Sequence, residues 1–204
     1  MAVTGLIMVV FLLLHMLGNL KIFFGPQDFD GYGRWLRTIG EPVLHGSWFL
    51  WVQRVVLAAA LVGHVTAAAQ LSRRDRLARP QQYAHRLRAR ATYATRTMRW
   101  GGIIIALFVV WHLLDLSLGL VNPHFEAGRP YQNVVVDFQV WWINLIYIVA
   151  VVLVGLHIQH GFASAARTLG SANITIQFIG TAIAALITIG FLAVPIAVMT
   201  GLVR

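Results

Sequence analysis

Four histidines lie inside long apolar segments of this sequence, one in each of the first four such segments: His15, His64, His112 and His157. An ionisable side chain at that depth in a membrane is costly, and it usually faces the interior of a helix bundle, where it serves a function. Neutral imidazole is the commonest metal ligand among side chains. One buried histidine would be weak evidence, but one in each of four segments predicts a shared cofactor site.

The alternative is that these histidines only form hydrogen bonds between packed helices, without binding anything. Small residues near them suit a bound ring, but ordinary helix packing in a membrane explains small residues equally well. His160, one turn after His157, is a rival for the same role. The remaining histidines, His45, His85 and His124, fall in polar stretches, where we expect them to be solvated.

The segments that carry the four histidines are membrane spans. The chain has 204 residues, of which 58% are hydrophobic and 11% are charged, more apolar surface than a soluble domain of this size could bury. Apolar runs of about 20 residues are long enough to cross the hydrocarbon layer as helices. We therefore predict one all-α transmembrane domain covering 1–204, with five spans, the first four forming a cofactor-binding bundle and the fifth flanking it. The expected bounds are about 3–24, 47–71, 99–121, 140–165 and 174–203.

Positive charge is concentrated in one loop between the second and third spans. Residues 72–99 hold nine of the sixteen lysines and arginines, against the single acid Asp75. Such a bias marks a cytoplasmic loop, so we place the loop at 72–98 and the N-terminus inside, and the C-terminus outside. Anionic lipid or an acidic partner subunit are secondary explanations of the charge. Because the net charge of +9 sits mainly in this loop, we do not expect nucleic acid as a partner.

This topology sorts the four histidines into two levels. At about 1.5 Å per helical residue, His15 and His112 lie roughly 18–20 Å from the cytoplasmic face, whereas His64 and His157 lie roughly 10 Å from it. Two facing imidazoles at one depth suit the axial ligation of haem b between helices. The expected pairs are His15 with His112 and His64 with His157, and two haems at two depths would form a transmembrane electron path.

Other polar residues in or near the spans are weaker candidates. Arg54 could pair with the propionates of an outer haem, or its side chain could extend to the outer headgroups. Asp115 follows His112 by three residues, so it could orient the imidazole or take part in quinone protonation, unless it pairs with an arginine. Glu41 and His45 bracket the outer end of the second span, where they are candidates for a quinone or proton site. The chain has no cysteine, so an iron–sulfur centre would need cysteines from another chain.

Several stretches resemble the single-chain, five-helix cytochrome b subunit of succinate dehydrogenases and fumarate reductases. They are TGLIMVVFLLLHMLGNL around His15, TMRWGGIIIALFVVWHLLD around His112, LVGLHIQHGF around His157, and the position of His64 before the basic loop. The resemblance covers nearly the whole chain. It implies a subunit of the bacterial cytoplasmic membrane that anchors a flavoprotein and an iron–sulfur subunit on the cytoplasmic side. It also implies that the four histidines bind two haems b, and that electrons leave to a membrane quinone, most simply menaquinone.

The sequence departs from this family at one informative position. Gly155 stands where some diheme fumarate reductases have a glutamate that transfers protons, which speaks against a compensating proton path. The family also includes anchors with fewer haems or none, so the alternatives are an anchor without haem or one with a histidine-ligated iron–sulfur centre shared with a partner. A diheme anchor of another respiratory dehydrogenase is a further alternative. A histidine-relay transporter is disfavoured, since no internal repeat is evident.

Overall fold

A computed structural model describes residues 1–78, 90–168, 170 and 174–204. In these residues the chain is helical without any strand, and five helices are long and apolar enough to cross a membrane. This confirms the all-α, multi-pass prediction. The five are α1 (Ala2–Leu20) with the 3₁₀ turn η1 (Lys21–Phe24), α3 (Trp48–Leu77), α4 (Arg90–His112) continuing as the π-helical turn η2 (Leu113–Ser117), α6 (Trp141–Thr168) and α7 (Ile174–Met199).

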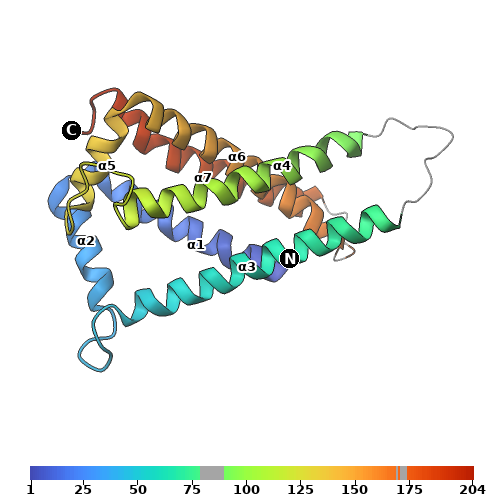
Figure 1. The fold of residues 1–204 in the computed structure, drawn as a ribbon, viewed down its shortest axis with the longest axis horizontal. Coiled ribbons are helices and arrows are strands. Elements are labelled where there is room, and N and C mark those ends of the chain that lie inside the picture. The colour runs from blue at the N-terminus through green and yellow to red at the C-terminus, as the bar shows by residue number, and fades with distance from the viewer. Residues whose placement is uncertain (79–89, 169, 171–173) are drawn as a thin grey trace.

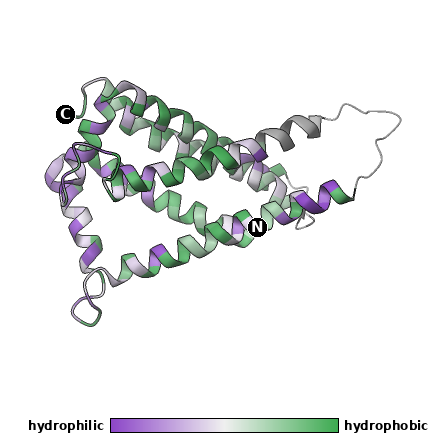
Figure 2. Ribbon diagram, viewed as in Figure 1, coloured by the Kyte–Doolittle hydropathy of each residue, from purple (hydrophilic) through white to green (hydrophobic). Residues whose placement is uncertain are grey.

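The basic loop expected at 72–98 is helical at both of its ends. Helix α3 continues to Leu77, and α4 already begins at Arg90. Residues 79–89, with His85 and three of the arginines, lie outside the described part of the chain. The arginines at the end of α3 are exposed, and Figure 2 shows this end as hydrophilic beyond the apolar spans. We call this the basic end of the molecule.

The other end carries two short helices where we expected loops. They are α2 (Pro26–Thr38) and α5 (Pro130–Gln139), and each begins with a proline, which is well suited to the first helical position because it needs no hydrogen bond there. The backbone N–H of Tyr131 on α5 donates to Asp30 on α2 at 2.9 Å, and the Tyr131 hydroxyl donates to the carbonyl of Arg204 at 3.0 Å. These bonds tie α2, α5 and the C-terminus together, and Figure 1 shows α5 close to the end marked C.

The spans form two sides that α7 connects. Helix α1 packs against α3, α4 packs against α6, and α7 packs along α6 and also contacts α1 (Figure 1). In their most apolar stretches, 33% of the residues of α6 and α7 are buried, against 6% for α3 and 11% for α4. The tightly packed part of the bundle is therefore around α6 and α7, while α3 and α4 leave most of their surface uncovered by the described chain.

Helix α7 is thus more than the flanking helix we expected. Its Ile187 is completely buried, and two close approaches bring it against its neighbours. A side chain at Gly155 of α6 would collide with Thr188, and one at Gly190 of α7 would collide with Met16 of α1. Small residues that allow such approaches are a common means of helix association in membranes. The absence of histidine from this span says nothing about its contribution to packing.

Candidate functional site

The structure brings the four histidines together as two pairs. The ring centres of His15 on α1 and His112 on α4 are 6.0 Å apart, with their planes at 76°. Those of His64 on α3 and His157 on α6 are 6.3 Å apart, with their planes at 61°. Each pair joins the α1–α3 side of the bundle to the α4–α6 side. These are the same pairs that the depth of each histidine indicated, although their role as ligands stays a prediction.

The spacing within both pairs suits two ligands of one metal. Bonds from metal to imidazole nitrogen are about 2 Å long in proteins, so two imidazoles on opposite sides of one metal have ring centres roughly 6 Å apart. No group of three or more histidines, aspartates or glutamates able to hold a metal ion occurs in the described residues. A macrocycle such as haem, which supplies four equatorial nitrogens of its own, needs only the two axial ligands that each pair offers.

The hydrogen bonds of His112 fix which of its nitrogens is free. The Tyr147 hydroxyl of α6 donates its one proton to Asp115 at 2.7 Å. Its oxygen also lies 3.3 Å from Nδ1 of His112, so there it can only accept a hydrogen bond from Nδ1–H. In a neutral imidazole with its proton on Nδ1, the lone pair is on Nε2. This is the arrangement of metal-binding histidines whose second nitrogen is held by an outer partner.

His64 has an equivalent arrangement in the other pair. The Thr4 hydroxyl donates to the carbonyl of Met1 at 3.0 Å and lies 3.2 Å from Nδ1 of His64. The same reasoning puts the His64 proton on Nδ1 and leaves Nε2 able to bind a metal. In both pairs, therefore, one histidine is held by a hydroxyl that is itself fixed by a second acceptor.

The partner histidines are positioned mainly by packing. The ring of His15 stacks on Phe11 at 5.2 Å and contacts Phe191 of α7 at 5.7 Å between ring centres. Nδ1 of His157 is buried without a hydrogen-bond partner among the described residues. A Cβ at Gly102 of α4 would lie 3.6 Å from Cε1 of His157, in ordinary van der Waals contact. The glycine thus leaves the His157 ring room against α4.

His160 does not take the place of His157. Its Nδ1 lies 2.8 Å from the carbonyl of Leu156 one turn earlier, to which it donates. The ring contact with His64 is made by His157. Of these two rivals for the fourth position, the structure places His157 in the pair.

Three other predicted site residues lie apart from the pairs. The guanidinium of Arg54 is exposed and stacks over Trp51 of the same helix at 5.1 Å. Glu41 and His45 are exposed in the connection between α2 and α3. No hydrogen bond or ring contact joins these residues to the four histidines in the part of the chain described. Asp115, by contrast, is 1% exposed and reaches His112 through Tyr147, without an arginine as partner in the described residues.

The sequence did not reveal a second buried acid beside Asp115. Asp137 on α5 is 3% exposed, and the two carboxyl groups are within hydrogen-bonding reach. Burial first, and then the charge and hydrogen bonding of Asp115, raise the pKa of Asp137 from 3.8 to about 7. Asp137 and Asn144 are seven residues apart and Tyr147 follows three later, a polar spacing that could have been noticed within an otherwise apolar stretch.

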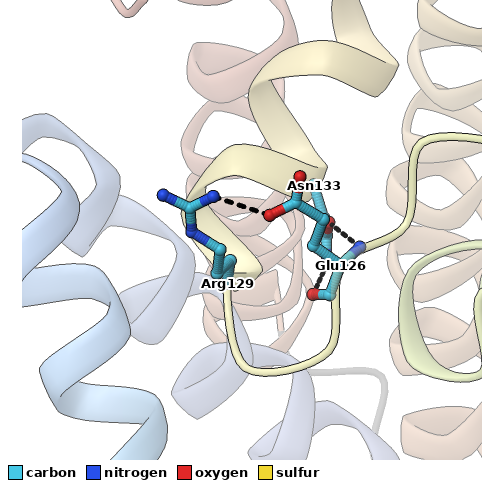
Figure 3. Close-up of polar contacts among 3 residues, drawn as sticks. All are labelled: Glu126, Arg129 and Asn133. Carbon is cyan, nitrogen blue, oxygen red and sulfur yellow. Dashed lines mark hydrogen bonds and ion pairs between the residues drawn. The ribbon is translucent and has the colours of Figure 1, made fainter.

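The buried asparagines and aspartates of the described residues lie toward the end opposite the basic end: Asp115, Asn122, Asn133, Asp137 and Asn144. Asn133 receives a hydrogen bond from the backbone of Glu126 and returns one to its carbonyl, while Arg129 pairs with the Glu126 carboxylate at 2.6 Å (Figure 3). Asn144 donates to the carbonyls of Phe138 and Pro195. These bonds hold α5 and the loop before it in a fixed position.

Comparison with protein-family models, with curated proteins and with solved structures gave no match. The fold and the site by themselves define a helical multi-pass membrane protein in which two pairs of histidines make contact between helices.

Proposed function

We propose that this chain is the membrane-anchor and electron-transfer subunit of a succinate:quinone oxidoreductase. The observation that carries the proposal is the pair of histidine contacts, each crossing the bundle and each with the ring spacing of a two-ligand metal site. The four histidines are also those that match the family motifs. The subunit would lie in a bacterial cytoplasmic membrane with its basic end inside.

In this proposal the chain's own residues hold and orient the cofactors. His15 and His112 would hold one haem b, and His64 and His157 the other. Haem b bound at each pair supplies one-electron carriage across the membrane. Tyr147 and Thr4 would keep Nε2 of His112 and His64 available.

The partner subunits and the quinone in this proposal are inferred from the family resemblance and from the positive charge at the basic end. The exposed arginines at the end of α3, Arg73, Arg74 and Arg76, lie where a flavoprotein and an iron–sulfur subunit would dock on the cytoplasmic side, or where anionic lipid would bind. Electrons from succinate oxidation would pass through those subunits to this chain and then to menaquinone or ubiquinone. This chain would contribute to the quinone site and have no succinate chemistry of its own.

The test is the dithionite-reduced minus oxidised absorbance spectrum of the purified complex, with haem counted per copy of this chain. We expect about two b-type haems. His64→Ala or His157→Ala should each remove about one, and His160→Ala should retain both, because His160 is bonded to Leu156 and lies outside the pair. Absence of haem from the wild-type complex would overturn the haem assignment, and electron paramagnetic resonance would then test a histidine-ligated iron–sulfur centre.

A second measurement separates this complex from other respiratory dehydrogenases with diheme anchors. Purification of the tagged chain should retain a polypeptide with covalently bound flavin that oxidises succinate. If two haems are found but the accompanying enzyme oxidises formate or hydrogen, the anchor proposal stands and the succinate assignment is wrong.

A further inference from the structure

The acids Asp115 and Asp137 form a buried pair without a cation. Both are at least 97% buried. The ion pairs in the described residues, Lys21 with Asp28 and Arg129 with Glu126, leave both of these acids out. Two adjacent carboxylates in a low-dielectric interior repel each other strongly, so the cheapest arrangement is one in which a single proton is bound between them.

The hydrogen-bond pattern points the same way. Oδ2 of Asp137 is buried and has no donor among the described residues. The nearest carboxyl, that of Asp115, can donate to Asp137 or accept from it only when one of the two acids is protonated. On its other side Asp115 accepts the hydrogen bond of Tyr147. A proton between the acids therefore satisfies a group that is otherwise left unpaired.

We propose that Asp115 and Asp137 hold one proton between them, and that Tyr147 links this proton site to His112. The pair lies where η2 and α5 meet, at the end of the molecule opposite the basic end. The coupling of the proton site to His112 rests on the proposed function. An electron added to a haem held by His112 would strengthen the binding of the proton by Coulomb attraction, and removal of that electron would weaken it.

Among the described residues, no other charged side chain that faces the pair replaces the proton. Helix α5 packs against α2, α6, α7 and η2. Asp115 faces Asp137 from η2, and Tyr147 faces it from α6. From α2, Asp30 is engaged by the backbone of Tyr131. The α7 residues that are buried in one hydrophobic cluster with α5 are Val194, Ala197 and Val198, which carry no charge.

Infrared difference spectroscopy tests the shared proton without any need for haem. The purified chain is titrated in detergent micelles, and the carbonyl stretch of protonated carboxyl groups is followed above the range in which exposed acids, with pKa values of about 4, lose their protons. We expect one such band in the wild type, shifted on exchange into deuterium oxide. Asp137→Asn should lose it, because Asp115 then accepts from both the amide and Tyr147.

Asp115→Asn distinguishes a shared proton from a single desolvated acid. If the proton is shared, the titration of Asp137 moves to lower pH, since the repelling carboxylate is replaced by an amide donor. An unchanged titration would overturn the pair. Glu126→Gln, which removes an exposed acid at the same end, should leave the band unchanged. Wild-type protein without the band would contradict the proposal whether or not either variant folds.

The link to His112 has its own measurement. In the haem-containing complex, one haem should have a midpoint potential that depends on pH in the range where the band titrates, and Asp137→Asn should abolish that dependence. A band in the wild type with no pH-dependent potential would refute the link alone. Failure of the proposed function would instead appear as a chain without haem that still shows the band.

Discussion

The Tyr147 hydroxyl, which donates to Asp115 at 2.7 Å, connects a buried carboxylate on η2 with the His112 ring, 3.3 Å away. Three helical elements meet at this one oxygen. It fixes the tautomer of the histidine, and it also fixes the side of Asp115 that remains available to Asp137. Substitutions around it therefore test both the proposed haem site and the proposed acid pair.

Tyr147→Phe should weaken both relationships while keeping the ring packing. The variant removes the hydrogen-bond partner of the His112 Nδ1–H and of the Asp115 oxygen Oδ2, which costs about 1–3 kcal/mol for each buried polar group. We expect a lower melting temperature and a changed midpoint potential for one haem. Tyr131→Phe is the matched control, because it removes a hydroxyl bonded only to the Arg204 carbonyl. Equal potential shifts in both variants would contradict the role of Tyr147.

Gly102→Val should remove one haem and Gly101→Val should not. A Cβ at position 102 lies 3.6 Å from the His157 ring, so the added methyl groups of valine would press against the imidazole, whereas a Cβ at position 101 meets nothing within 4 Å. Both substitutions put the same β-branched residue in the same helical turn, so their effects on helix propensity cancel. Haem per chain is the measurement, and equal loss in the two variants would argue against the His64–His157 site.

Asp137→Asn should change how stability depends on pH. The folded state raises the pKa of Asp137 from 3.8 to about 7, so the native protein holds the proton more tightly than the unfolded chain does. That stabilisation is fully present below the unfolded pKa and is lost as pH rises through the folded pKa, by up to roughly 4 kcal/mol. The variant cannot lose this proton.

The melting temperature of the wild type should therefore fall relative to Asp137→Asn between about pH 4 and about pH 7. Asp28→Asn, which alters an exposed acid near Lys21, serves as the control and should run parallel to the wild type. Parallel curves for the Asp137 variant would mean that this carboxyl ionises normally.

Asn144→Leu should destabilise the bundle without emptying the histidine sites. Asn144 is completely buried and donates to two carbonyls, those of Phe138 and Pro195, and the variant removes both hydrogen bonds at a cost of roughly 2–4 kcal/mol. Gln159→Leu removes a longer, exposed bond to Thr181 of α7 and should cost about 0.6 kcal/mol. Thermal unfolding in detergent gives the comparison. A melting temperature that falls no further for Asn144→Leu than for Gln159→Leu would contradict the bracing role.

Hydropathy and helix geometry predicted the spans and the histidine pairs because both depend on position along a single helix. Span length follows from the apolar runs, and the depth of His15 or His64 follows from counting residues at a constant rise. The short helices α2 and α5 were taken for loops because they are too short and too polar to resemble spans. The direction in which each side of a helix faces depends on the neighbouring helices. Counting residues along one segment does not specify those neighbours.

Asp115 illustrates the difference. Its spacing of three from His112 predicted a direct relationship between the two side chains in a regular helix. The turn from Leu113 is instead π-helical, and Tyr147 of another helix stands between the two. The spacing therefore identified the right residue but not its partner. Asp137 was overlooked because it belongs to α5, whose packing against η2 is a tertiary contact.

The contact of Gly155 with Thr188 has a consequence for how this protein could change. A glutamate at position 155 has no room, because Thr188 of α7 already fills the volume that any side chain there would need. A glutamate could be accommodated there only together with a smaller residue at position 188 or a shift of the whole α7 helix. Introducing a proton-transferring acid into α6 therefore requires changes in both α6 and α7. In evolution by single substitutions, a change that weakens the packing of α7 against α6 would have to come first.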